Sequence, residues 1–261
     1  MKEFGFIRVG AIVNKLILAN PLKNAEELIK EIKNAKKLGV SIVTTPELSL
    51  TGYTCGDLFL QDKLLSDSEK ALQKVLEETK KLDIISILGM PIKQNNQLFN
   101  CAIVISKGEI LGAIPKTYIP NYQEFYEARW FASSKELKSH DIEILGQTVP
   151  ITTDILFQDK TLKEAIFAIE ICEDLWTVTP PSNNHALAGA TIIFNLSSSN
   201  ELIGKQEYRK SLVSSQSAKT ISAYIYTSSG IMESTSDILF GGASMIYENG
   251  SKLAENKRFE I

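Results

Sequence analysis

Apolar residues recur along the chain in two patterns, as short continuous runs and as runs spaced by three or four residues. The continuous runs predict strands at residues 6–13, 42–45, 84–88, 99–105, 110–114, 151–157, 165–172, 191–195, 223–227 and 243–247. The spaced runs predict helices at about 24–38, 66–80, 181–188 and 205–220. Strands that alternate with helices are typical of an α/β fold.

Turn and cap residues divide these elements. Asn24 is expected to cap the first helix and Gly39 to end it. Hairpins are predicted at 106–109 and at Asn249-Gly250, and residues 151–157 are expected to pair with 165–172. The segment 117–150 is polar with several aromatic residues, which predicts a long loop with little regular structure. We expect one domain, because no linker rich in Pro, Gly or Ser divides the chain.

Composition restricts the function classes. The chain has 261 residues, 44% of them hydrophobic, and a formal net charge of -3. This charge gives no electrostatic reason to expect a nucleic acid or an anionic membrane as partner. The sequence lacks the roughly 20 consecutive apolar residues that span a bilayer, and its first residues lack a signal-peptide core. We therefore expect a cytoplasmic protein.

Cysteine and histidine are scarce. The three cysteines are an odd count without C-x-x-C spacing, so neither a disulfide framework nor a metal site is expected. His140 and His185 both lie in polar stretches, where a solvated surface histidine is the expected role. A catalytic histidine is therefore not predicted.

Three reactive side chains follow apolar runs. Cys172 ends the segment 169–172, which directly follows the apolar run 165–168. Glu47 follows the run 41–46, and Lys116 follows the run 110–115. A thiol, a carboxylate and an amine, each at the end of a strand, could form one site with a nucleophile, a base and a cation. Alone, each has an ordinary role as a small buried hydrophobe, a turn cap or a solvated lysine.

The chemistry of such a site is specific. A thiol with a pKa of about 8.5 is little ionised at neutral pH, and Glu173 and Asp174 beside Cys172 would raise the pKa further. Activation must therefore come from elsewhere in the chain. Glu47 could take the proton, Lys116 could stabilise an oxyanion, and the N–H of Glu173 could be the second oxyanion donor.

The sequence segments around these three residues resemble those of a known family. Segments 46–53 (PELSLTGY), 115–122 (PKTYIPNY) and 170–176 (EICEDLW) resemble the three signatures of the nitrilase, or carbon–nitrogen hydrolase, superfamily, in the same order. The resemblance implies a four-layer α-β-β-α sandwich. It also implies that Glu47 is the general base, Lys116 the oxyanion stabiliser and Cys172 the nucleophile.

Further segments are similar to the glutaminase domain of glutamine-dependent NAD+ synthetases. They are 6–9, 50–59, 120–122, 125–127 and 129–131. This resemblance covers essentially the whole chain. It implies hydrolysis of L-glutamine through a glutamyl thioester, without a cofactor, to supply ammonia for NAD+ synthesis from deamido-NAD+.

The same resemblance implies a set of substrate residues. The aromatic residues Tyr53, Tyr122 and Trp176 match positions that line the glutamine pocket. Glu127 matches a second glutamate that orders the substrate or Lys116, and Ser199 and Lys205 match positions that hold the amino-acid end of glutamine. The family often has a proline after the serines at 197–199, which this chain lacks.

The resemblance also implies a partner. We expect residues 1–261 to be one glutaminase domain, and the ATP- and Mg2+-dependent synthetase domain, which is normally fused to it, to be absent, because no S-G-G-x-D-S loop occurs. The family implies a homo-oligomer. Two alternatives stay open, namely a stand-alone amidase or carbamoylase of the superfamily and a catalytically silent regulatory or assembly domain.

Overall fold

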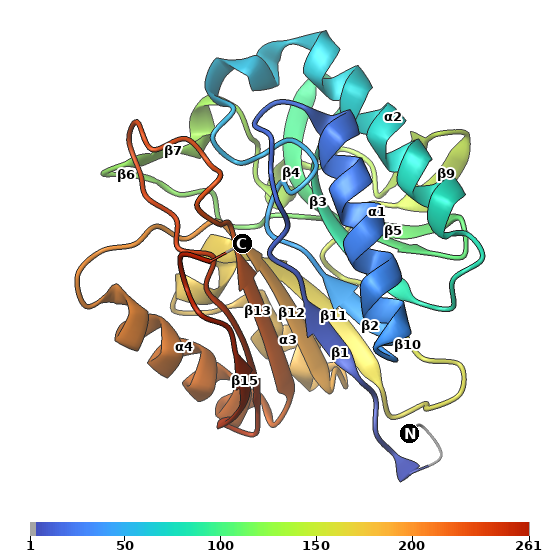
Figure 1. Cartoon of the computed structure of the whole chain (residues 1–261), viewed down its shortest axis with the longest axis vertical. Helices are drawn as coiled ribbons and strands as arrows, with labels where there is room; N and C mark the ends of the chain where they lie inside the picture. The colour runs from blue at the N-terminus through green and yellow to red at the C-terminus, as the bar shows by residue number, and fades with distance from the viewer. Residues whose placement is uncertain (1–3, 261) are drawn as a thin grey trace.

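Residues 4–260 are described by a computed structural model and form four layers. Two sheets face each other, helices α1 and α2 cover the outer face of one, and α3 and α4 cover the outer face of the other (Figure 1). The predicted α-β-β-α sandwich is confirmed.

The first sheet has the strand order β1-β2-β3-β4-β5. The first three strands run parallel, and β3, β4 and β5 form an antiparallel meander. The strands are β1 (Val9–Ala11), β2 (Ile42–Thr44), β3 (Ile85–Gln94), β4 (Gln97–Ser106) and β5 (Glu109–Pro115). Helices α1 (Pro21–Lys37) and α2 (Asp62–Thr79) pack on it.

The second sheet has the order β10-β11-β12-β13-β14-β15, with β11, β12 and β13 parallel. Its strands are β10 (Phe157–Gln158), β11 (Ile166–Ile171), β12 (Ile192–Ser197), β13 (Ala223–Ser228), β14 (Ser244–Glu248) and β15 (Ser251–Glu255). Helices α3 (Pro181–Leu187) and α4 (Lys205–Thr220) cover its outer face.

Strand side chains alternate between two buried layers. Ile42 lies in the core between the sheets, and its neighbour Val43 packs toward the helices α1 and α2. In β11, Phe167 and Ile169 face the first sheet, whereas Ala168 lies in the layer between the second sheet and its helices. Strands buried on both faces read as continuous apolar runs, which is why these segments were recognisable from the sequence.

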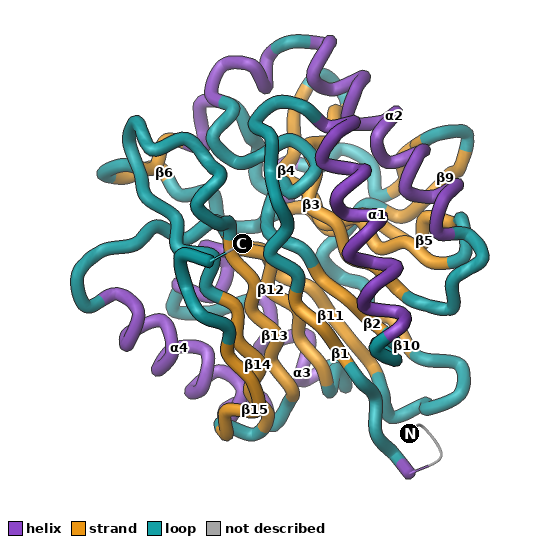
Figure 2. Tube along the Cα trace, viewed as in Figure 1, coloured by secondary structure: helices purple, strands orange, loops and turns teal. Residues whose placement is uncertain are grey.

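The segment 117–150 is more regular than predicted (Figure 2). It contains two hairpins, β6 (Asn121–Tyr122) with β7 (Phe125–Tyr126), and β8 (Asp141–Ile144) with β9 (Gln147–Pro150). It also contains the 3-10 helices η3 (Glu127–Arg129) and η4 (Ser134–Glu136). Leu145 and Gly146 both have positive φ, the geometry of a tight hairpin turn. The prediction of a long loop with little regular structure was therefore wrong. The elements were missed because they are short and polar.

Several boundaries also differ. The strand predicted at 151–157 is wrong, since only Phe157–Gln158 pairs with β11 and Ile151 forms a single bridge to Ala113. Helix α2 begins at Asp62 rather than at 66. A third 3-10 helix, η2 (Gly56–Leu60), precedes it.

Two polar residues have other roles than predicted. Asn20 caps α1, whereas Asn24 lies inside the helix, where its side chain binds the backbone of Ile17 and Leu50. His185 is buried in α3, and its Nε2 lies 3.0 Å from the carbonyl oxygen of Thr153. The expectation of a surface histidine was therefore wrong for His185.

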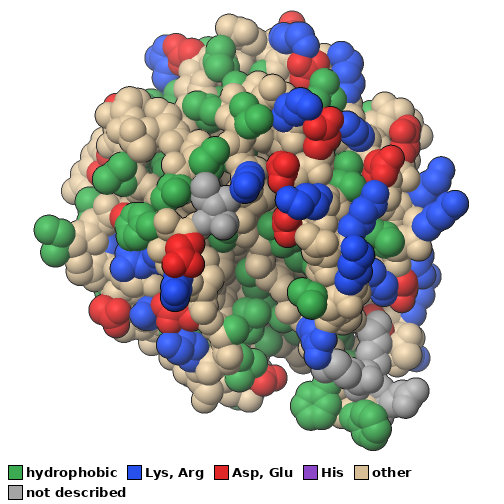
Figure 3. All heavy atoms as spheres, viewed as in Figure 1, with side chains coloured by type: hydrophobic (Ala, Val, Ile, Leu, Met, Phe, Trp, Pro, Cys, Tyr) green, Lys and Arg blue, Asp and Glu red, His purple; other side chains and the backbone are tan. Residues whose placement is uncertain are grey.

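The surface over α1 and α2 carries both signs of charge, as Figure 3 shows. Lys33 pairs with Glu78, and Lys74 pairs with Glu26. In the part of the chain that the structure describes, no helix is both long and apolar enough to cross a membrane.

Candidate active site

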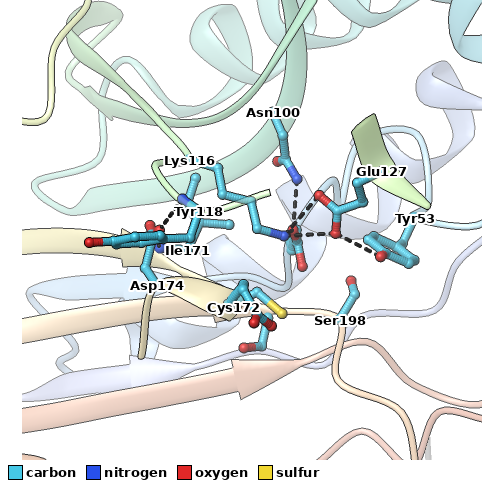
Figure 4. Close-up of polar contacts among 12 residues, drawn as sticks. Tyr53, Asn100, Lys116, Tyr118, Glu127, Ile171, Cys172, Asp174 and Ser198 are labelled. Carbon is cyan, nitrogen blue, oxygen red and sulfur yellow. Dashed lines mark hydrogen bonds and ion pairs between the residues drawn. The ribbon is translucent and has the colours of Figure 1, made fainter. Parts of the chain in front are cut away.

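The three residues singled out from the sequence meet at one end of the two sheets. Figure 4 shows Lys116 and Cys172 in this site. Glu47 follows β2, Lys116 follows β5, and Cys172 begins the 3-10 helix η5 (Cys172–Trp176) directly after β11. Their exposed fractions are 1%, 0% and 5%. Two segments from the first sheet and one from the second therefore bring a carboxylate, an amine and a thiol into one buried site.

A fourth residue, Glu127 of η3, completes an ion cluster. Lys116 Nζ lies 2.7 Å from Glu47 Oε1, 2.7 Å from Glu127 Oε1 and 2.9 Å from Glu127 Oε2. Asn100 Nδ2 donates to Glu47 Oε1 at 2.6 Å. The second oxygen of Glu47, Oε2, is buried and accepts no hydrogen bond from the described residues. Glu47 thus keeps one carboxylate oxygen available for a proton.

Burial and charge act in opposite directions on this cluster. Burial works to lower the pKa of Lys116, but the carboxylates of Glu127 and Glu47 raise it well above its usual value. Burial raises the pKa of Glu127 to about 7, with Glu47 adding to the rise and Lys116 opposing it. Burial is therefore the main cause of the raised pKa of Glu127, and the single charge of Lys116 does not offset it.

The thiol is neutral at rest. Burial raises the pKa of Cys172 above that of a free thiol, and the charge of Glu47 raises it further. Lys116 and the backbone N–H of Ser198 work in the opposite direction. The thiol therefore loses its proton only when a nearby base accepts it.

The loop that carries Glu47 is held against β3 at Gly89. A Cβ at Gly89 would lie 2.2 Å from the backbone nitrogen of Leu48 and 2.7 Å from the carbonyl oxygen of Pro46. The carbonyl oxygen of Gly89 accepts the N–H of Leu50 at 3.0 Å. Leu48 has a φ of 51°, a conformation that is strained for leucine. Only glycine allows the close approach that places Glu47.

The turn that carries Cys172 is also strained and is tied to the Lys116 segment. Cys172 has a φ of 48°. The buried carboxylate of Asp174 accepts the backbone N–H of Ile171 at 2.9 Å, of Tyr118 at 2.8 Å and of Thr117 at 3.1 Å. Asp174 therefore fixes the end of β11 relative to the residues that follow Lys116.

The residues predicted to line the substrate pocket surround this cluster unevenly. Tyr53 is buried, and its hydroxyl donates to Glu127 at 2.7 Å. Tyr122 is half exposed, and its hydroxyl donates to Glu173 at 3.0 Å. Tyr53 therefore belongs to the ion cluster, whereas Tyr122 lies at its outer edge.

The outer edge also contains Trp176 and Lys205. The ammonium of Lys205 lies 5.0 Å from the centre of the Trp176 ring, which packs on Tyr208. Ser199 is buried, and its hydroxyl accepts Arg209 Nη2 at 3.3 Å. The structure thus places Lys205 beside the aromatic wall and engages the Ser199 side chain with α4.

Three residues of the site were not predicted from the sequence. They are Asn100, which binds Glu47, Gly89, which admits the Glu47 loop, and Asp174, which was expected only to repel the thiolate. Asn100 had a readable signal, since it is a polar residue inside the apolar run of β4. Gly89 had a signal as well, since a glycine inside an apolar strand often marks a close approach of another backbone segment.

Metal ligands are not gathered anywhere in residues 4–260, where no group of three or more His, Cys, Asp or Glu side chains is placed to hold an ion. The absence of a metal from the reaction stays a prediction.

The fold and the site define a class of enzyme. Residues 11–261 match the carbon–nitrogen hydrolase family, and the chain belongs to this family. The fold class that the signatures at 46–53, 115–122 and 170–176 implied is therefore the right one.

Particular relatives are more specific. The chain is 39% identical over 257 residues to the glutamine-dependent NAD(+) synthetase of Mycobacterium tuberculosis. This alignment covers 98% of this chain and 38% of that protein. It is 28% identical over 243 residues to the human glutamine-dependent NAD(+) synthetase, covering 91% of this chain and 34% of that protein. The chain thus spans somewhat more than a third of the length of these relatives.

Solved structures agree with this assignment. A glutamine-dependent NAD(+) synthetase from Cytophaga hutchinsonii superposes with a TM-score of 0.84 at 27% identity, over 97% of this chain and 40% of that one. An amidase from Nesterenkonia sp. superposes with a TM-score of 0.76 at 14% identity, over 96% of this chain and 86% of that one. The amidase shares the fold.

Proposed function

We propose that this domain hydrolyses the side-chain amide of L-glutamine and releases ammonia for the synthesis of NAD+ from deamido-NAD+. The observation that carries the proposal is the convergence of Glu47, Lys116 and Cys172 in one buried site. These three groups do not by themselves distinguish glutamine from the substrates of other carbon–nitrogen hydrolases. The choice of glutamine is supported by the names of the relatives.

The first half-reaction forms a thioester. Glu47 takes the proton of Cys172 as the sulfur attacks the amide carbon. This transfer leaves the total charge of the site unchanged, which suits a site where burial disfavours new charge. Lys116 and the N–H of Glu173 stabilise the oxyanion. Glu47 then gives its proton to the leaving nitrogen, and ammonia departs.

The second half-reaction hydrolyses the thioester. Glu47 accepts a proton from water as the water oxygen attacks the thioester carbon, and the same two donors stabilise the second oxyanion. The intermediate then collapses to glutamate, and the departing sulfur regains a proton from Glu47. Glu127 holds Lys116 in position throughout, and no cofactor takes part.

The outer residues supply recognition. The ammonium of Lys205 suits the α-carboxylate of glutamine. Tyr53, Tyr122 and Trp176 form the wall along which the substrate lies, and Ser199 assists at the amino-acid end. The ammonia is consumed by an ATP- and Mg2+-dependent synthetase domain, and the assembly is a homo-oligomer.

The test is a comparison of substrates. We expect L-glutamine to release ammonia with a higher kcat/KM than N-carbamoyl amino acids and other ω-amides, and Cys172→Ala to release none. A clear preference for another amide would contradict the glutamine assignment and favour a stand-alone amidase or carbamoylase. Basal turnover can be low without its synthetase domain, so the ratio between substrates decides.

A second test follows the thiol itself. In a variant of the amidase from Nesterenkonia sp. AN1, acrylamide is joined to the active-site cysteine by Michael addition. We expect acrylamide to add to Cys172 in the same way. If no cysteine reacts and no amide is hydrolysed, the domain is catalytically silent.

A further inference from the structure

A buried chain of hydrogen bonds leads from α3 to the backbone of Cys172, outside the ion cluster. The N–H of Cys172 donates to Asn195 Oδ1 at 3.2 Å, and Asn195 Nδ2 donates to the hydroxyl of Tyr224 at 3.1 Å. That hydroxyl donates to Glu170 Oε1. The other carboxylate oxygen of Glu170 accepts the N–H of Ser182 at 2.8 Å. Asn195, Tyr224, Glu170 and Ser182 are each 0% or 1% exposed.

The direction of every bond in this chain follows from Glu170. Burial raises the pKa of Glu170, whereas the hydrogen bonds from Tyr224 and Ser182 lower it and favour the charged form. In that form the carboxylate can only accept, so the single proton of the Tyr224 hydroxyl points toward it. The hydroxyl can then only accept from Asn195, which must present its amide NH2 group there. The oxygen of Asn195 is thereby left for the N–H of Cys172, and the hydroxyl of Ser197 donates to the same oxygen at 2.8 Å.

This oxygen meets Cys172 where the backbone needs support. The φ of 48° at Cys172 lies in the left-handed region, which is unfavourable for a cysteine. Cys172 also stands at the start of η5, where the first N–H groups lack partners within the turn. The bond to Asn195 supplies a partner for one of them and holds it away from the substrate side.

We propose that Glu170, Tyr224 and Asn195 are positioning residues that hold the Cys172 backbone in its left-handed conformation, with Glu170 setting the hydrogen-bond direction. The inference rests on the proposed role of Cys172 as nucleophile. None of the three side chains touches the reacting atoms, and each acts through its neighbour in the chain.

The substitution Glu170→Gln tests the direction of the bonds rather than their presence. The N–H and the hydroxyl of Ser182 both donate to Glu170, which keeps the oxygen of a glutamine on the Ser182 side. The NH2 group of the glutamine then faces Tyr224, whose hydroxyl turns to donate to Asn195. The hydroxyl finds an acceptor there only if Asn195 flips and presents its NH2 group to the N–H of Cys172, so that two donors face each other.

The experiment is a double-mutant cycle with Glu170→Gln and Tyr224→Phe. We expect Glu170→Gln to lower kcat by about tenfold to a hundredfold, as for a displaced reacting group, with KM nearly unchanged. Tyr224→Phe alone should have a small effect, because two donors still hold the Asn195 oxygen in place. In the Glu170→Gln background, Tyr224→Phe should raise kcat, because Asn195 can then turn back. This reversal of sign is not expected from a residue that only fills space.

The rate at which acrylamide alkylates Cys172 is measured on the same four proteins and should follow kcat. If wild type alkylates normally but does not hydrolyse glutamine, the proposed substrate fails while the alkylation rates still decide the inference. If Tyr224→Phe lowers both rates in both backgrounds, or Glu170→Gln leaves them unchanged, the inference is overturned. Should Glu170→Gln not fold, Asn195→Ala replaces it. A fall in kcat and alkylation at unchanged KM then supports the inference, and wild-type rates overturn it.

Discussion

The two sheets hold their parts of the site by different means. The first sheet supplies Glu47 and Lys116, which bind each other and Glu127 through hydrogen-bonded ion pairs of 2.7–2.9 Å. The second sheet supplies Cys172, whose thiol is neutral and whose backbone is held by Asn195 and by the turn around Asp174.

The two parts of the site, the ion cluster and the thiol, should therefore respond differently to substitution. In the charged half, loss of one partner leaves a buried charge uncompensated, so stability and activity should fall together. In the thiol half, the side chain has no such partner to lose, so activity should fall with little loss of stability. The predictions below test this contrast, beginning with the largest effect.

Cys172→Ala should abolish ammonia release while the unfolding midpoint changes little, because the proposed mechanism forms the thioester on this thiol and the thiol is not part of the ion cluster. Turnover and thermal unfolding of the same sample give both quantities. Cys101→Ala is the matched control, since Cys101 is also buried but lies in the core beside α1 and α2. Its activity should be retained at some cost in stability, and ammonia release by Cys172→Ala would remove Cys172 from the mechanism.

Lys116→Ala should lower turnover by at least about a hundredfold, the lower end for loss of an oxyanion donor. It should also lower the free energy of unfolding by about 3–5 kcal/mol, because Glu47 and Glu127 lose their buried cation. Denaturant unfolding and ammonia release measure the two effects. Lys33→Ala, which removes the exposed pair with Glu78, should change stability by no more than about 1 kcal/mol. Turnover of Lys116→Ala within tenfold of wild type would contradict its role.

Gly89→Ala should displace the loop that carries Glu47, because the new methyl group would overlap the backbone of Pro46 and Leu48. We expect a loss of about 1–3 kcal/mol in stability and about a tenfold to hundredfold loss in kcat. Gly10→Ala is the control, since its nearest atom would be Val40 Cγ1 at 3.4 Å, an ordinary contact. Equal behaviour of the two variants would show that the close approach at Gly89 is unimportant.

A further effect should appear in the pH dependence of stability. The pKa of Glu127 is about 7 in the folded protein against an ordinary 4.5. Because folding favours the neutral form, the stabilisation is fully present below about pH 4.5 and is lost as pH rises through 7, amounting to about 3 kcal/mol at most. Glu127→Gln should remove this part of the decline between pH 4.5 and 7. An unchanged pH profile would show that Glu127 is ionised throughout.

The α/β class of the fold and the position of the three reactive residues at strand ends were predictable from the sequence for a physical reason, whereas the four-layer arrangement was implied by the resemblance to the nitrilase superfamily. Both faces of the central strands are buried, so the strands are visible as apolar runs, and the reactive residues follow directly where those runs end. The convergence of Glu47, Lys116 and Cys172 was inferred from the shared position at strand ends together with the signature segments.

The supporting contacts were not predictable in the same way. The partners of Cys172 and of Glu47 come from β12 and β4, and their pairing depends on strand register across the sandwich. Short polar hairpins such as β8–β9 were not predicted, because the alternation of apolar and polar residues covers only four residues in each strand. The bonds from Glu170 to Asn195 follow only from the three-dimensional packing of Tyr224 between them.

The most direct test of the account is the site of covalent labelling by a glutamine-like electrophile, identified by mass spectrometry of the digested protein. The account predicts that Cys172 is labelled, that excess L-glutamine protects it, that Glu47→Gln slows the reaction, and that Cys55 and Cys101 are spared. Labelling of Cys55 or Cys101 in preference to Cys172, or labelling of Cys172 at the same rate without Glu47, would contradict it.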